Sequence, residues 1–71
     1  MSVKLKFHRG GPGQYLADHN GKTYELFRTV ERDYGVTWII SCVDTGQNIE
    51  PASTKWAAIL DLQEAIERGI I

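Results

Sequence analysis

Two short motifs in the sequence carry residue types that could perform chemistry. The tripeptide Asp-Thr-Gly at 44–46 has the form of the aspartic protease motif, and the glycine-rich tetrapeptide at 10–13 has the composition of a phosphate-binding loop. An aspartic protease needs two such carboxylates sharing one proton, so a short chain would have to dimerise. Gln47 and Asn48 follow the tripeptide, whereas the retroviral enzymes continue with a small residue and a second glycine-bearing strand. We therefore interpret residues 44–46 as a turn.

The other reactive groups lack partners at the spacing that catalysis or metal binding requires. No Lys-Ser or Lys-Thr pair follows the glycine cluster at 10–13, so this segment is predicted to be a turn. His8 and His19 have no further ligands at metal-binding spacing. Cys42, the one cysteine, lies in an apolar segment, where a thiol acts as a small apolar residue with a raised pKa. We expect no enzymatic activity, no metal site and no cofactor.

The composition describes one small domain over residues 1–71. The formal net charge is −1, and a basic N-terminal strand or arm, residues 1–9, holds Lys4, Lys6 and Arg9 without an acidic residue. A chain of this length buries about 60% of its unfolded surface, so its core is small. The apolar run 36–43 is too short to cross a membrane, and the N-terminus lacks the apolar core of a signal peptide. We expect a cytosolic protein without a membrane partner.

Strand patterns followed by one helical pattern predict an α+β fold. We expect a three- or four-stranded antiparallel sheet with one C-terminal helix packed on one face, in the order β-β-β-β-α. Alternation over 3–8 predicts a first strand, which the glycines at 10–13 end. Asn20-Gly21 is typical of a two-residue hairpin turn and predicts antiparallel hairpins over 14–43, with a second turn at 31–35. Residues 47–52, which contain Pro51, are predicted to be a loop.

The Asn-Gly turn also sets the strand register, because a slip of one residue would move every side chain to the other face. The predicted pairs are His19 with Lys22, Ala17 with Tyr24, Tyr15 with Leu26, Tyr24 with Cys42, Leu26 with Ile40, Arg28 with Trp38 and Val30 with Val36. One face of the sheet then gathers the large apolar residues for the helix.

A helix is predicted over residues 54–68. Ser53 or Thr54 caps its start, Gly69 ends it, and Ile70 is placed for the apolar contact that accompanies such an end. The stripe expected to cover the sheet consists of Ala58, Ile59, Leu62, Ala65 and Ile66, and the solvent face of Ala57, Asp61, Glu64 and Arg68.

Two apolar groups remain outside this interface and point to a protein partner. The first is a helix flank with Trp56, Leu60, Gln63 and Glu67; the second, on the open face of the sheet, is Leu16, Phe27 and Ile39. Contiguous exposed apolar patches are uncommon on monomers. We therefore predict a non-catalytic protein-interaction module that also self-associates and has no small-molecule substrate. The alternative is that the N-terminal strand or the loop 47–52 covers a patch.

A second hypothesis is nucleic-acid binding. A sheet followed by a C-terminal helix resembles the amino-terminal DNA-binding domains of some phage-type integrases, which place the open sheet face in the major groove. Here that face would present Gln14, Thr23, Thr29 and Thr37 to the bases, and the phosphate contacts would be Lys4, Lys6, Arg9, Lys22 and Arg28. Asp18 and Glu25 on the same face would repel phosphate.

The order of motifs carries a broader resemblance. The hairpin Tyr15-Leu16 to Leu26, the strand Val-Thr-Trp-Ile at 36–39, the turn at 44–46 and the alanine-containing helix resemble small sheet-then-helix proteins encoded by actinobacteria and their bacteriophages. The resemblance covers most of residues 14–68 and carries no catalytic residue. It implies a small protein that binds and modulates a bacterial host protein in the host cytosol.

Overall fold

The strands and the helix follow one another in the predicted order in the computed structural model, which describes residues 3–33 and 35–71. Met1 and Ser2 of the predicted basic arm, and Tyr34 of the predicted turn 31–35, lie outside the described residues. The elements are β1 (His8–Gly11), β2 (Gln14–His19), β3 (Lys22–Glu31), β4 (Gly35–Cys42), β5 (Asn48–Ala52) and α1 (Lys55–Glu67).

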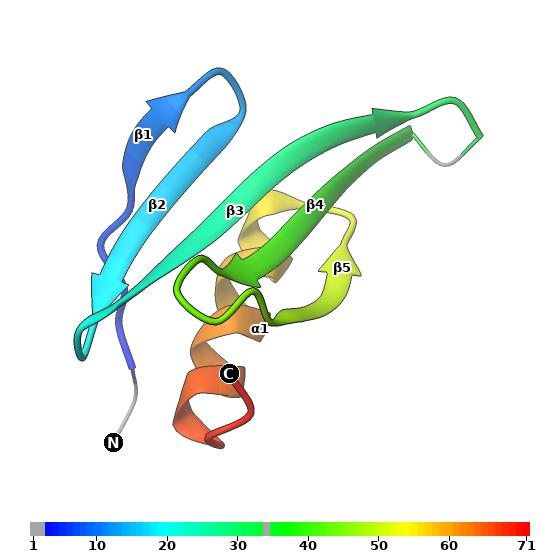
Figure 1. Cartoon of the computed structure of the whole chain (residues 1–71). Coiled ribbons are helices and arrows are strands. Elements are labelled where there is room, and N and C mark those ends of the chain that lie inside the picture. Colours follow the sequence, from blue (N-terminus) through cyan, green and yellow to red (C-terminus); the bar gives the residue numbers. More distant parts are fainter. Residues whose placement is uncertain (1–2, 34) are drawn as a thin grey trace.

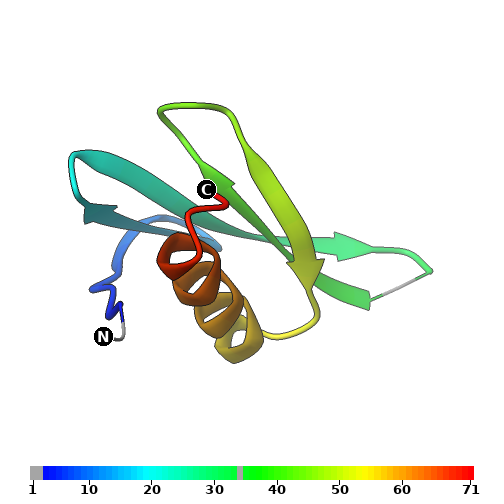
Figure 2. The same cartoon turned by 90° about the horizontal axis from the view of Figure 1, so that it is seen from below.

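One antiparallel sheet contains all of these strands in the order β1-β2-β3-β4-β5, and α1 packs against one of its faces (Figure 1). We call this face the helix side and the opposite one the open face. The fold is α+β with one C-terminal helix, as predicted, but the sheet has five strands where three or four were expected. The end of the β3–β4 hairpin extends beyond the helix (Figure 2).

Both predicted hairpin registers are confirmed. Asn20 (φ 51°) and Gly21 (φ 78°) make the turn between β2 and β3, and positive φ at both positions is what a primed two-residue turn requires. All seven predicted pairs are present, from His19 opposite Lys22 to Val30 opposite Val36. The helix side therefore receives the apolar residues that the register assigned to it.

The first strand differs from the prediction. Residues 3–7 form no strand, and β1 runs from His8 into two of the glycines that were expected to end it. At Gly10 a Cβ would lie 2.8 Å from Gln14 Oε1 and 2.9 Å from Leu16 Cδ1, so a larger residue here would displace the ends of these two β2 side chains. The alternation at 3–8 has another cause: Leu5 and Phe7 pack against the core, while Lys4 and Lys6 are exposed.

The predicted loop at 47–52 was also wrong, because residues 48–52 pair with β4 as the fifth strand. Ile49 lies opposite Ile40 and Ala52 opposite Trp38, with a register irregularity between the two pairs. Pro51 is tolerated because β5 is an edge strand, and a proline that cannot donate to a ladder is confined to such edges and bulges.

The helix begins and ends as predicted. The Thr54 side chain accepts a hydrogen bond from the Ala57 amide at 3.1 Å. At the other end Gly69 has φ 71°, and the Ile70 amide donates to the Ala65 carbonyl at 2.9 Å, which completes a Schellman motif. The expected apolar contact of Ile70 is wrong, since Ile70 is exposed and Ile71 is buried instead.

The core lies between α1 and the helix side of the sheet. Its buried members are Tyr24, Leu26, Trp38, Ile40, Cys42, Ala52, Ala58, Leu62, Ala65 and Ile71. The predicted helix stripe is confirmed, with Ile59 and Ile66 half-buried at its margin; Ala57, expected in solvent, also packs partly against the core. Among the described residues, no helix has the length and apolar character to span a bilayer.

Candidate interaction surfaces

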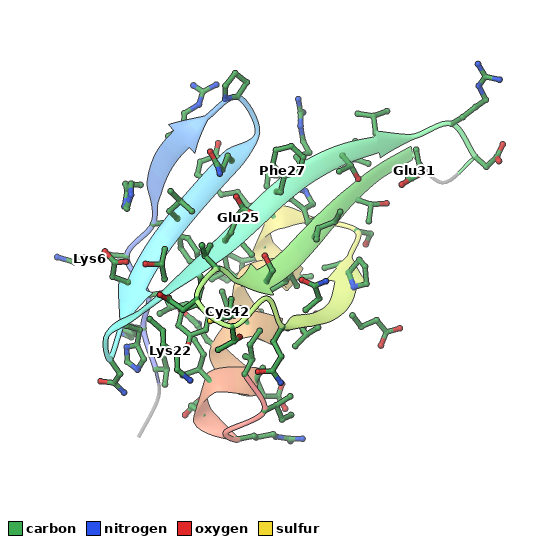
Figure 3. All side chains as sticks on the ribbon, in the orientation of Figure 1. Lys6, Lys22, Glu25, Phe27, Glu31 and Cys42 are labelled. Atoms are coloured by element: carbon green, nitrogen blue, oxygen red, sulfur yellow. The ribbon has the colours of Figure 1, made fainter. Side chains whose placement is uncertain are left out.

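The open face of the sheet carries an apolar patch formed by Leu16, Phe27 and Ile39. Phe27 lies directly opposite Ile39 on β4, and Leu16 of β2 pairs with Glu25, which places it diagonal to Phe27. Phe27 keeps 40% of its surface exposed, and its two neighbours are half-buried. Figure 3 shows Phe27 and Glu25 projecting from this face. The three predicted residues therefore form one continuous patch in the middle of the sheet.

The charges around this patch are acidic. The register places Asp18, Glu25 and Glu31 on the open face, and the described residues of β1 to β4 place no lysine or arginine there. Two of the carboxylates are held by neighbours: Glu25 accepts a hydrogen bond from Gln14, and Asp18 accepts one from the Thr23 hydroxyl at 2.6 Å. The open face therefore combines an apolar centre with fixed negative charge.

The helix flank predicted as a second surface is also exposed. Trp56 keeps 70% and Leu60 46% of its surface in solvent, although residues 3–7 and β5 have both docked against the molecule. Gln63 accepts a hydrogen bond from the Leu5 amide at 3.1 Å, and Glu67 is exposed. The N-terminal segment therefore contacts the flank at Gln63 and leaves Trp56 and Leu60 exposed.

A third feature lies at the start of α1, on the helix side of the sheet. A pocket of about 280 Å³ is lined by Arg9, Gly13, Tyr15, Arg28, Trp38 and Lys55, and we call it the basic pocket. The Lys55 ammonium lies 3.7 Å from the centroid of the Tyr15 ring. The Tyr15 and Trp38 rings lie 6.0 Å apart between centroids and are tilted by 42°. Three cations from three elements thus surround two aromatic rings.

Two cations of the pocket were expected elsewhere, as phosphate contacts around the open face of the sheet. Of the five basic residues proposed as phosphate contacts, the structure brings together Arg9 and Arg28, on the helix side and away from the open face. Lys22 is the first residue of β3 and lies beside the Asn-Gly turn, at the end of β2 that is far from the pocket. Lys4 and Lys6 belong to the N-terminal segment. Lys55 was missed, because its place depends on where the first helical turn meets the sheet.

The residues first considered for catalysis have structural roles. Asp44 accepts a hydrogen bond from the Thr23 amide and so ties the turn after β4 to the start of β3. Cys42 is fully buried. Burial raises the pKa of its thiol, but hydrogen bonds with Thr45 and with the Asp44 backbone outweigh this effect, so the pKa lies below its ordinary value rather than above it as predicted. No three His, Cys, Asp or Glu side chains in residues 3–33 and 35–71 are grouped to hold a metal ion.

A further groove separates β5 from α1. It has a volume of about 380 Å³, and its lining includes Ile49, Asp61, Ala65, and the ion pair in which Arg68 lies 2.8 Å from Glu64. Its one cation is already paired with a carboxylate, whereas Glu50 and Asp61 of the lining form no ion pair among the described residues.

Comparison with protein-family models, with curated proteins and with solved structures finds no match.

Proposed function

We propose that this protein is a small interaction domain that binds a partner protein through the open face of its sheet. One observation carries the proposal: within residues 3–33 and 35–71 no helix or strand packs over the open face of the sheet (Figure 2), whose centre is the patch of Leu16, Phe27 and Ile39. A partner that covers this patch removes apolar surface from water, which is the main driving force of most protein association. Aromatic residues at the centre and polar residues at the rim are typical of such interfaces.

The charge of the open face favours a basic partner over a second copy of this chain. Two copies packed face to face would bring Asp18, Glu25 and Glu31 of one copy near those of the other. Like charges brought together in this way suppress association, whereas a complementary potential speeds and orients it. The partner surface should therefore place an aromatic or aliphatic centre between lysine or arginine residues.

The matched pair Phe27→Ala and Val30→Ala tests this proposal. Both residues are exposed and both lie on β3, but Val30 belongs to the helix side. The probe is a panel of synthetic peptides with aromatic residues spaced by lysine or arginine, alongside the same peptides with glutamate, and binding is followed by NMR. We expect the basic peptides to shift the signals of Leu16, Phe27 and Ile39, Phe27→Ala to weaken binding at least tenfold, and Val30→Ala to change it less than twofold.

The outcomes separate clearly. Binding of basic peptides that maps to the open face and depends on Phe27 supports the proposal. Equal effects of the two variants, equal binding of the glutamate peptides, or no binding by any member of the panel would overturn it.

The helix flank is a second candidate surface, and we propose it for self-association. Its supporting observation is the exposure of Trp56, because tryptophan is among the residue types most enriched at the energetic centres of interfaces. Leu60 lies one helical turn away and extends the apolar surface. Of the two polar residues of the flank, Gln63 is neutral and only Glu67 is charged. Two copies that meet through this flank would therefore bring few like charges together.

A further inference from the structure

We infer that the basic pocket is a binding site for a small phosphate monoester that carries a planar group. The pocket lies on the helix side of the sheet, so this inference is independent of the interaction proposed for the open face. Its cations come from β1, β3 and the first residue of α1, three elements that only the folded chain brings together.

The strand register fixes one wall of the pocket. Arg9 lies opposite Tyr15, and Arg28 lies opposite Trp38, so two arginines and two aromatic rings share the helix side. Gly13 closes the wall: its carbonyl accepts a hydrogen bond from the Arg28 amide at 2.8 Å. With φ 69°, and with a Cβ that would lie 3.4 Å from the Arg28 Cβ, this position favours glycine and holds the β1–β2 turn beside the Arg28 side chain.

The cations of the pocket have no acidic partner in the part of the chain that the structure describes. None of the lining residues is acidic, and within residues 3–33 and 35–71 the only ion pair joins Arg68 and Glu64. Converging like charges repel each other, and each costs stability unless an anion lies among them. The pocket therefore has the charge to attract a dianion.

The position of Lys55 supports the same conclusion. Lys55 is the first residue of α1, where the helix dipole presents its positive end, and the first turn of the helix contains no acidic residue. A cation at this end is unfavourable, and an anion is favourable. The contact with the Tyr15 ring stabilises this cation but supplies no negative charge for the helix dipole, and real proteins break such local rules mainly at functional sites. A bound anion would offset both the helix dipole and the three side-chain charges.

The chemistry of the lining selects the ligand class. Arginine guanidinium groups bind phosphate oxygens through paired hydrogen bonds, and two of them reach this pocket. Tyr15 and Trp38 supply an apolar wall beside the charges. A volume of about 280 Å³ is larger than a phosphate ion occupies and approaches that of small-ligand sites. The site thus has room for a phosphate together with an attached ring.

Phenyl phosphate, adenosine monophosphate, inorganic phosphate and adenosine are the probes that test this inference. Titrations are followed by NMR at the Gly13 amide and the Trp38 indole, with the Gly21 amide at the other end of β2 as reference. We expect both monoesters to bind saturably and more tightly than inorganic phosphate, and adenosine not to bind. Affinity should fall as salt rises, because the attraction is electrostatic.

Variants connect the binding to named side chains. Arg28→Gln should lower the affinity for phenyl phosphate by about tenfold or more, which corresponds to the loss of a charge-assisted hydrogen bond. Lys55→Gln should lower it by about threefold to tenfold. The control Lys22→Gln removes one positive charge outside the pocket and should change the affinity less than twofold. Circular dichroism verifies that each variant is folded. We expect Arg28→Gln to fold, because Arg28 is exposed.

Several results would overturn the inference. Absence of saturable binding by both monoesters, or equal losses in the Arg28, Lys55 and Lys22 variants, would reject the site. Equal affinity for phenyl phosphate and inorganic phosphate would show that the pocket does not bind a planar group, and would reject the inferred ligand class. A DNA duplex that binds more tightly than the monoesters and loses affinity when Lys4 and Lys6 are replaced would assign the cations to nucleic acid instead.

Discussion

Two leucines on α1 give a direct test of which side of the helix packs against the sheet, an orientation on which both proposed surfaces depend. Leu62 is fully buried against the sheet, whereas Leu60 keeps 46% of its surface exposed on the helix flank. Replacing either by alanine is the same chemical change in the same helix, so differences in helix propensity cancel. The comparison therefore isolates the burial of each side chain.

The expected costs differ severalfold. Truncation of a fully buried leucine to alanine costs about 2–5 kcal/mol, from lost transfer free energy and the remaining cavity. A domain of 71 residues has a total unfolding free energy of about 4–11 kcal/mol at ordinary per-residue values. Leu62→Ala should thus remove a large share of the stability and, at about 3 kcal/mol, lower Tm by about 12–24 °C. Leu60→Ala should cost less than about 1 kcal/mol.

Urea unfolding followed by circular dichroism measures both variants against the wild type. The slope of the transition should stay constant, since the surface exposed on unfolding is nearly the same in all three proteins. Equal destabilisation by the two substitutions, or a larger effect of Leu60→Ala, would show that α1 is rotated about its axis relative to this description. The helix flank would then belong to the core, and Trp56 would lose its place as an interaction residue.

Two further perturbations test the helix flank and the core. Trp56→Ala should leave stability nearly unchanged, because the indole is 70% exposed. It should weaken self-association, measured by sedimentation velocity across a concentration series. A variant that unfolds, or that associates like the wild type, would contradict the role of the helix flank in self-association. Burial, with smaller contributions from Cys42 and Asp44, raises the pKa of Tyr24 above its ordinary value of 10.0. The folded state therefore holds the Tyr24 proton more tightly than the unfolded state does. The stability that this protonated side chain contributes is complete below pH 10.0 and is lost as pH rises above it. Urea midpoints between pH 8 and 11 should fall less steeply for Tyr24→Phe than for the wild type, and parallel declines would contradict this.

The parts of the fold that local chemistry determines could be predicted from the sequence. Asn20-Gly21 specified its turn because few residues accept positive φ, and the alternation of the flanking residues then left only one register with a continuous apolar face. Thr54 and Gly69 specified the helix ends for similar reasons. In each case a few neighbouring residues contain the whole physical cause.

The parts that depend on distant contacts were missed. Residues 3–7 alternate like a strand, but an extended segment that packs Leu5 and Phe7 on the core gives the same pattern without a ladder. Residues 48–52 form a strand only because β4 offers an unpaired edge, which the polar residues and Pro51 of the segment do not reveal. The basic pocket needs β1 beside β2 and the helix start beside both, so Lys55 carried no signal in the sequence.

The two proposed binding regions on the sheet share one geometric origin. A helix of 13 residues is about 20 Å long, whereas the 10 residues of β3 span about 33 Å. One helix therefore cannot cover the helix side completely, and the far end of the β3–β4 hairpin extends past it (Figure 2). Arg28 lies opposite Trp38 and lines the pocket at the start of α1, while its neighbour Phe27 points to the open face because strand side chains alternate. A lone α1 against a long twisted hairpin thus leaves a basic recess on one face and an acidic, apolar surface on the other.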